Sequence, residues 1–286
     1  MTALVLGAAG MLGSAIVNCF GSAQCIALFR KDYDLSKAED IDAIFERFDF
    51  DVFINCAAYT RVDDAESDKT AAKQINADAI EYLAKACKQH DVLLVHFSTD
   101  YVFNGEKEGP FSEEDACDPI NYYGYTKLLG EQHIQAHCSR YYIFRVQWLY
   151  GDNGKHFLKT MCRLFQERDE LTVVNDQFGS PTNVRTIAEF LKQFLQENAP
   201  FGIYHYSAEG LCSWYEYALF LAEELGYKGR IQAVPCSEFV TPAKRPKNGH
   251  LSTAKLKAVS AVHIPTWQED VKAFLSSSEF STIQAS

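Results

Sequence analysis

The sequence predicts an α/β fold built on a doubly wound parallel sheet, with a smaller, interleaved C-terminal lobe. Through about residue 150, short apolar runs alternate with amphipathic stretches of helical length. The first apolar run leads directly into a triplet of glycines, and the fourth ends in Ser98-Thr99-Asp100. Such alternation produces parallel strands covered by helices on both faces, with ligands at the carboxyl ends of the strands. The pattern is typical of a Rossmann-type sheet.

The first strand is expected over residues 2–6 and the first helix through about residue 20, joined by Gly7-Ala8-Ala9-Gly10-Met11-Leu12-Gly13. Glycines at this point let the backbone approach a pyrophosphate, which the helix N-terminus attracts. Gly7, Gly10, Met11, Leu12 and Gly13 are therefore predicted to bind a dinucleotide. The alternative is a tight turn with close helix packing.

The second strand, expected over 24–29, ends where an acidic residue normally meets the ribose 2′-hydroxyl of a dinucleotide. Here the chain has Arg30 and Lys31, and the first acid is Asp32. Because a guanidinium pairs bidentately with phosphate oxygens, Arg30 favours NADP(H), with NAD(H) as the second option. A solvated loop is the alternative. Asp34 and Leu35 are included in the cofactor site, and Ser36 is expected to cap a helix to about residue 48.

The third strand, expected over 51–55, continues into Cys56-Ala57-Ala58-Tyr59-Thr60. Small residues at the carboxyl end of a strand let a ribose or a cofactor ring lie against the backbone, so Ala57, Ala58 and Tyr59 are predicted to contact the cofactor. A long helix follows over about 67–89. Asn76 within it is counted in the cofactor site, either as a satisfied core amide or as a contact beneath the catalytic loop.

The fourth strand, over 92–97, leads to Thr99, and the next helix, over about 121–136, carries Tyr123 and Lys127. Residues four apart share a helix face, so the phenol and the ammonium can reach one substrate oxygen. The Lys127 cation is expected to lower the pKa of Tyr123, which is ordinarily about 10. With the Thr99 hydroxyl, these groups are predicted to serve a carbonyl that accepts a hydride, with Tyr123 as proton donor.

The Tyr-x-x-x-Lys spacing is weak evidence by itself, because a chain with 15 tyrosines contains such pairs by chance. A second pair, Tyr33 and Lys37, is expected between a strand and a helix, where a solvated surface pair is the simpler interpretation. The position of Tyr123 after the fourth strand distinguishes the two pairs.

Beyond a fifth strand at 141–146 the alternation loosens. Helices are expected over about 156–167, up to about 196 and over 213–225, and strands over 171–175 and 202–206. The predicted organisation is a dinucleotide-binding domain over 1–151, rejoined by about 180–207, and a mainly substrate-binding lobe over 152–286. The small, polar residues of about 276–286 are expected to form a disordered tail.

Bulk properties exclude several classes of function. The formal charge of −11 over 286 residues disfavours nucleic-acid and membrane-surface binding, which need clustered cations. Nine cysteines without a Cys-x-x-Cys pair are typical of free thiols in a reducing compartment, and Cys87 with His90 is more often a helix end than half a metal site. No apolar run approaches ~20 residues and no basic leader precedes the first strand. A cytoplasmic monomer or homodimer without a metal is expected.

These motifs resemble those of the extended short-chain dehydrogenases/reductases and, among them, the dTDP-4-dehydrorhamnose reductase family. The resemblance covers nearly the whole chain. It is carried by the segments 7–13, 55–60, 62–63, 65–66, 75–77, 98–105, 145–151 and 176–182, by Tyr123-Gly124-x-x-Lys127-x-x-Gly130-Glu131 and by Arg245-Pro246-x-Asn248.

The resemblance implies hydride transfer from NAD(P)H to the C4 ketone of dTDP-4-dehydro-β-L-rhamnose, which gives dTDP-β-L-rhamnose. It further implies that Tyr123 donates the proton, that Lys127 binds the nicotinamide ribose and tunes the phenol, and that Thr99 assists. By the same resemblance, Trp148 contacts the sugar with Thr99 and Asp100. Arg245 would contact the diphosphate.

The chain departs from the family pattern at two places. Ser252 stands where Asp or Asn is usual, and Val146-Gln147 replaces a commoner Thr-Ser. Some relatives dimerise through magnesium bound by acidic side chains. Ser14-Ala15 offers no such carboxylate, so no metal-bridged dimer is expected.

Two other functions are also compatible with the sequence. An epimerase or dehydratase on the same fold would need a further acid or base, and Tyr101 stands where dehydratases of this type have Glu. An epimerase would also hold its nicotinamide permanently. A regulatory subunit, like the relative that serves methionine adenosyltransferase, would keep the cofactor cleft but turn over no ketosugar.

Overall fold

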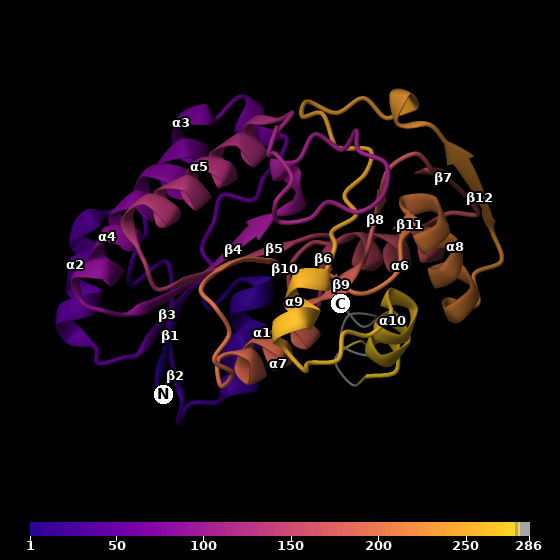
Figure 1. Cartoon of the computed structure of the whole chain (residues 1–286). Helices are drawn as coiled ribbons and strands as arrows, with labels where there is room; N and C mark the ends of the chain where they lie inside the picture. The colour runs from indigo at the N-terminus through magenta and orange to yellow at the C-terminus, as the bar shows by residue number, and fades with distance from the viewer. Residues whose placement is uncertain (278–279, 281–286) are drawn as a thin grey trace.

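A six-stranded parallel sheet organises the N-terminal part of the computed structural model, which describes residues 1–277 and 280 (Figure 1). Its strands are β1 (Ala3–Leu6), β2 (Cys25–Leu28), β3 (Val52–Asn55), β4 (Leu93–Thr99), β5 (Tyr141–Val146) and β10 (Gly202–His205). The strand order is β10-β5-β4-β3-β1-β2, and all neighbours are parallel. The predicted α/β class is confirmed. Because β2 and β3 lie on opposite sides of β1, the order reverses there, and ligands bind beside such a reversal.

Helices cover both faces of the sheet. One face carries α1 (Met11–Phe20) and α7 (Val184–Phe194); the other carries α2 (Ala38–Arg47), α4 (Ala79–Gln89) and α5 (Tyr122–His137). In β1, Val5 packs toward α1 and Leu6 toward α2, because successive strand residues point to opposite faces. The strands are buried on both sides, which explains their continuous apolar runs.

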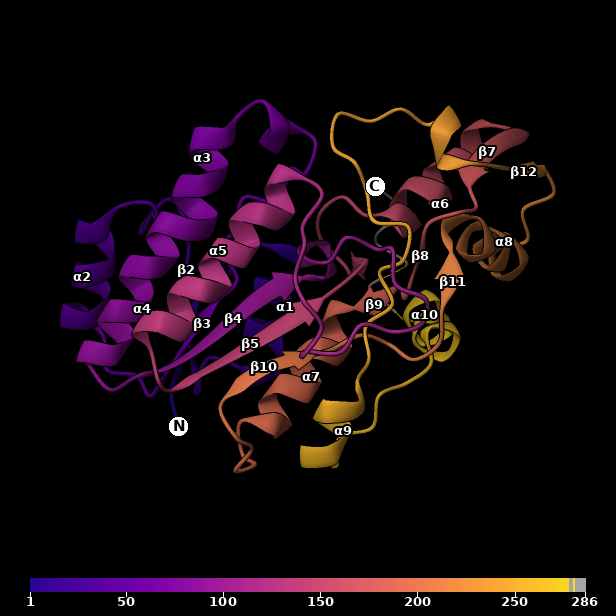
Figure 2. The ribbon, with the colours of Figure 1, turned by 45° about the horizontal axis from the view of Figure 1, so that its top comes forward.

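A smaller lobe packs beside the carboxyl ends of the strands (Figure 2). It contains α6 (Phe157–Glu167), α8 (Trp214–Leu225), α10 (Trp267–Leu275) and the parallel pair β7 (Glu170–Val174) and β12 (Arg230–Val234). Two-residue strands tie the lobe together, namely β6 (Leu149–Tyr150), β8 (Phe178–Gly179), β9 (Thr182–Asn183) and β11 (Cys212–Ser213). Between β12 and α10 the chain returns to the sheet, where α9 (Ala254–Val259) contacts β10.

The structure differs from the sequence-based expectation in the long third helical region. A π turn at Gln74–Asp78 separates α3 (Lys69–Lys73) from α4, and Asn76 lies in that turn. The predicted Ser36 cap is wrong: α2 starts after Lys37, and both polar groups of Ser36 donate to Asp34 instead.

The strands and α-helices of the C-terminal half that were not expected are β6, β8, β9, β11, β12, α9 and α10. Of the predicted tail, residues 278–279 and 281–286 lie outside the described residues, and the domain boundaries stay a prediction. In the part of the chain that the structure describes, no helix is both long and apolar enough to span a membrane.

Candidate active site

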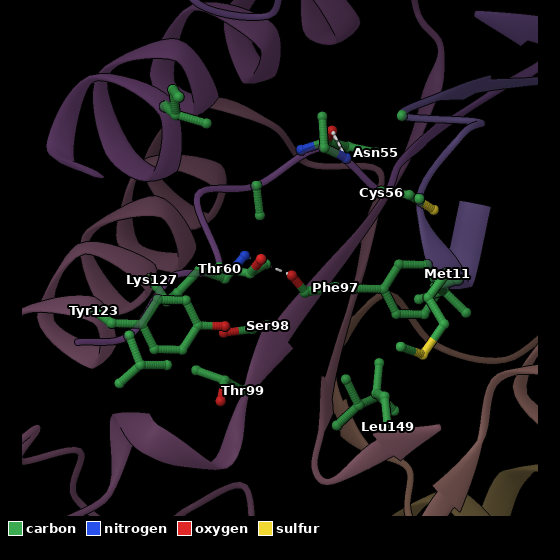
Figure 3. Close-up of a pocket in the computed structure, with 18 of the residues that line it drawn as sticks. Met11, Asn55, Cys56, Thr60, Phe97, Ser98, Thr99, Tyr123, Lys127 and Leu149 are labelled. Atoms are coloured by element: carbon green, nitrogen blue, oxygen red, sulfur yellow. Dashed lines mark hydrogen bonds between the residues drawn. The ribbon is translucent and has the colours of Figure 1, made fainter. Parts of the chain in front are cut away.

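A cavity of about 630 Å³ lies at the carboxyl ends of the central strands, between the sheet and the smaller lobe. The predicted residues that line it are Gly7, Gly10, Met11, Leu12, Arg30, Asp34, Leu35, Ala57, Ala58, Thr99, Asp100, Tyr123, Lys127 and Trp148. Figure 3 shows Tyr123, Thr99 and Lys127 on one side of this space and Met11 and Leu149 on the other. One cavity thus unites the predicted cofactor turn with the predicted catalytic groups.

The glycine turn between β1 and α1 leaves backbone donors open toward the cavity. Gly7 has φ +86°, and a Cβ there would lie 2.8 Å from the Ala57 nitrogen, so only glycine fits. Gly10 precedes α1 without a side-chain cap, which leaves the first N–H groups of the helix free for an anion. Gly13 does not line the cavity. A Cβ there would lie 2.2 Å from the Gly7 carbonyl oxygen, so Gly13 lets α1 pack against the turn.

The end of β2 presents a cation and a carboxylate to the same part of the cavity. The Arg30 Nε lies 3.6 Å from an Asp34 carboxylate oxygen, and the Arg30 side chain is largely exposed. Burial opposes ionisation of Asp34, but hydrogen bonds from Ser36 and the charge of Arg30 lower its pKa overall. A 2′-phosphate could pair with the exposed guanidinium, whereas a free 2′-hydroxyl could donate to the carboxylate.

Tyr123 and Thr99 meet because α5 begins close against the end of β4. The Asn121 side chain caps α5 by accepting from the Gly124 N–H at 2.8 Å. A Cβ at Gly124 would lie 2.1 Å from the Tyr101 carbonyl oxygen, so this glycine permits the close approach. The Tyr123 ring packs edge-on against Tyr101, with centroids 5.9 Å apart, and points toward Ser98 and Thr99 in Figure 3.

The pKa of Tyr123 is raised, which corrects the expected lowering. Burial is the main cause, the Asp100 charge adds to it, and a hydrogen bond with Thr99 opposes it. The Lys127 amine is engaged elsewhere, because it donates to the Phe97 carbonyl oxygen at 2.7 Å. The phenol is therefore protonated at neutral pH, which is the state that the predicted role of proton donor needs.

Two neighbouring groups titrate near neutrality. Burial raises the pKa of the Asp100 carboxyl to about 7, although hydrogen bonds from Thr99 and from backbone N–H groups oppose it. The Thr99 hydroxyl donates to Asp100 at 3.0 Å. Burial also lowers the pKa of Lys127 to about 8, against the attraction of Glu131.

Several buried polar residues that support this site were missed in the sequence. Glu131 accepts from Arg145 Nη2 at 2.7 Å and also binds the Ser98 hydroxyl, and both ionic side chains are almost fully buried. His96 belongs to β4 itself, and its Nε2 lies 3.2 Å from the Lys127 Nζ. The sequence signal that could have identified them is a basic residue inside an otherwise apolar strand, namely His96 in β4 and Arg145 in β5.

Trp148 forms the wall on the side of the smaller lobe. It lines the cavity with Trp214, and the two indoles stack with centroids 3.4 Å apart at 9°. Trp148 has φ +45°, an uncommon backbone state for a bulky residue. A large flat surface therefore faces the predicted catalytic groups from across the cavity.

Asn76, Tyr59 and Arg245 do not line the cavity, and their predicted ligand roles stay predictions. Asn76 accepts from the Tyr59 N–H at 2.8 Å and donates to its carbonyl at 3.0 Å, so it holds the loop after β3 in place. The Tyr59 side chain turns away, toward Asp68. Arg245 pairs with Asp63 at 2.8 Å, which joins the C-terminal loop to the larger lobe.

Elsewhere among the described residues, Glu81, His133 and His137 offer ligand atoms that all lie within 4.8 Å of one another, on α4 and α5. They do not line the cavity, and Lys85 is paired with Glu81.

Known proteins resemble this chain over nearly its full length. A family model described as RmlD substrate binding domain matches residues 1–280. The dTDP-4-dehydrorhamnose reductase of Escherichia coli (strain K12) is 38% identical over 96% of this chain and 97% of its own length. The crystal structure of the Bacillus anthracis dTDP-4-dehydrorhamnose reductase in complex with NADP superposes with a TM-score of 0.92 at 33% identity, covering 96% of this chain and 99% of that one.

A second solved structure, a dTDP-4-dehydrorhamnose reductase from Clostridium acetobutylicum, superposes with a TM-score of 0.91 at 36% identity and covers 96% of this chain and 98% of its own. The similarity to the sequence relatives and to the solved structures thus spans both the parallel sheet and the smaller lobe. The chain therefore belongs to the dTDP-4-dehydrorhamnose reductase family, within the extended short-chain dehydrogenases/reductases.

Proposed function

We propose that the protein reduces the C4 ketone of dTDP-4-dehydro-β-L-rhamnose to an alcohol, giving dTDP-β-L-rhamnose, with NADPH as the favoured reductant. The observation that carries this proposal is the convergence of Thr99, Tyr123 and Lys127 on the same cavity as the glycine turn. Membership of the dTDP-4-dehydrorhamnose reductase family supports the identity of the sugar nucleotide.

The cofactor site fits a dinucleotide. Gly7 leaves no room for a side chain, the N-terminus of α1 is uncapped, and small residues Ala57 and Ala58 line the floor. These groups would hold the pyrophosphate and a ribose, and Arg30 would pair with a 2′-phosphate. When bound, the reduced nicotinamide supplies the hydride.

Tyr123 would protonate the oxygen that gains negative charge as the hydride arrives. Its raised pKa keeps the proton available, and the Thr99 hydroxyl can donate to the same oxygen or to the resulting phenolate. A Lys127 cation would stabilise that phenolate and bind ribose hydroxyls. The indole of Trp148 would cover the sugar and exclude water.

The remaining substrate assignments are Asp100 for a sugar hydroxyl and Arg245 for the diphosphate. Asp100 lies at the cavity wall beside Thr99. Arg245 is bound to Asp63, so it would have to exchange that partner for a phosphate. We also propose a cytoplasmic location, because all nine cysteines carry free thiols.

The experiment is direct. Purified protein is mixed with dTDP-4-dehydro-β-L-rhamnose and either NADPH or NADH, and the loss of reduced-nicotinamide absorbance is followed. We expect catalytic consumption with formation of dTDP-β-L-rhamnose and a higher kcat/KM for NADPH. No consumption with this sugar or with other nucleotide 4-ketosugars would refute the proposal. Epimer formation without net consumption would indicate an epimerase.

A further inference from the structure

A buried chain of hydrogen bonds runs from the backbone after β3 to the catalytic lysine. The Ala57 N–H donates to Asn55 Oδ1 at 3.0 Å, and Asn55 Nδ2 lies 3.1 Å from His96 Nδ1. His96 Nε2 then lies 3.2 Å from Lys127 Nζ, which donates to the Phe97 carbonyl oxygen at 2.7 Å. The side chains of Asn55, His96 and Lys127 are all at most 2% exposed.

The groups at the two ends of this series of hydrogen bonds determine which atoms donate and which accept. A backbone N–H can only donate, and a carbonyl oxygen can only accept. Because Ala57 donates to the Asn55 oxygen, the Asn55 NH₂ must face His96, whose Nδ1 then accepts. In a neutral imidazole the other nitrogen carries the hydrogen, so His96 Nε2–H points at Lys127.

An ammonium group has no lone pair to accept that hydrogen, whereas a neutral amine has one. The opposite arrangement would require the Asn55 amide to turn over, which would place its NH₂ 3.0 Å from the Ala57 N–H, donor against donor. Burial lowers the pKa of His96, so the imidazole is neutral at neutral pH and carries a single N–H.

We propose that Asn55 and His96 are positioning residues that, beyond the effect of burial, hold Lys127 as a neutral amine in the cofactor-free enzyme. The inference deepens the proposed function, since it concerns the state of the lysine that would bind the ribose. It means that Lys127 gains its proton when ribose hydroxyls replace the His96 contact. The Tyr123 phenol then has a Lys127 cation beside it only when the cofactor is bound.

The other ionisable groups around Lys127 do not reverse the direction of these hydrogen bonds. Glu131, one turn later on α5, attracts a proton to Lys127 but is itself paired with Arg145 from β5. The Cys56 thiol beside the lysine stays protonated, because burial raises its pKa. Ser98, also on β4, binds Glu131 rather than the lysine.

The test is the tautomer of His96 in cofactor-free protein, read from ¹⁵N shifts of the imidazole at neutral and mildly alkaline pH. The His96 signals are assigned by comparison with H96L. We expect the Nε2–H form in the wild type. In Asn55→Asp the carboxylate accepts from both Ala57 N–H and His96 Nδ1–H, so we expect the Nδ1–H form and a Lys127 cation. An Nδ1–H form in the wild type would overturn the proposal.

The second readout is the pH profile of kcat/KM. The proposed reaction requires a Lys127 cation. The alkaline limb of the kcat/KM profile should therefore move to higher pH by about 1 pH unit or more in Asn55→Asp. The matched control compares H96L with the double variant N55D/H96L, in which only the added charge acts, and there we expect a clearly smaller shift. An equal shift in both pairs would overturn the proposal. The tautomer needs no substrate, so failure of the proposed reaction would not affect that result.

Discussion

Replacing Tyr123 by phenylalanine removes one oxygen atom and leaves the surrounding packing in place. The Tyr123 ring contacts Tyr101 edge-on at 5.9 Å, and phenylalanine preserves that contact. The lost oxygen is the proposed proton donor, and general acid catalysis of this kind contributes about 10²–10⁴-fold. At about 1.4 kcal/mol per tenfold, the transition state should lose about 3–5 kcal/mol of stabilisation.

The assay measures kcat and KM from NADPH consumption and the NADPH dissociation constant from fluorescence. We expect kcat to fall at least about 10²-fold while cofactor binding stays within a few-fold. Tyr125→Phe is the matched control, because Tyr125 lies on the same helix, is exposed and does not line the cavity. Near-normal turnover in Tyr123→Phe, or an equal loss in the control, would refute the assignment of the proton donor.

Three other predictions test the cofactor site, the buried ion pair and the buried acid. Arg30→Gln should raise KM for NADPH about tenfold or more and change KM for NADH little, since a charge-assisted contact is worth about 1.5–3 kcal/mol; equal effects on both cofactors would contradict a 2′-phosphate partner. Arg145→Met should lower the free energy of unfolding by about 3–5 kcal/mol in urea titrations, because it leaves Glu131 buried without its partner, and a loss below 1 kcal/mol would be too small for that mechanism. Asp100 has a raised pKa, so the folded state binds its proton more tightly than the unfolded chain does. As the pH rises from about 4 to 7, the Asp100 contribution to the free energy of unfolding should therefore fall by at most about 4 kcal/mol. Asp100→Asn should flatten the unfolding free energy over that window, and an unchanged slope would show that Asp100 ionises without penalty.

The parallel sheet and the glycine turn could be predicted from the sequence because their causes are local. A strand buried on both faces is apolar throughout, and the sharp turn at Gly7 demands a residue with positive φ. The π turn around Asn76 could not be predicted in the same way, because it depends on contacts with Tyr59 and Thr126, and Thr126 lies 50 positions away in sequence. The same holds for α9, which packs against the distant strand β10.

The predicted site was incomplete where electrostatics depend on burial. Spacing on α5 brought Tyr123 and Lys127 into one cavity but could not show that burial dominates both of their pKa values. Arg245 looked available for a diphosphate, yet its partner Asp63 lies in a loop far away in sequence. His96 carried no motif of its own, and its importance emerges only from the atoms at its two nitrogens.

Burial has a common effect on the titratable groups Tyr123, Asp100 and Lys127 of the cavity: it favours their neutral forms. It raises the pKa of Tyr123 and of Asp100 and lowers that of Lys127. By contrast, the buried ion pair of Glu131 and Arg145 lies just behind them, joined by several hydrogen bonds. A site with few uncompensated charges loses little when water leaves it, so a nucleotide sugar can be enclosed without a large desolvation penalty. The charges that the reaction needs, on the substrate oxygen and on Lys127, would then arise inside a closed site, where fixed donors such as Thr99 act most strongly.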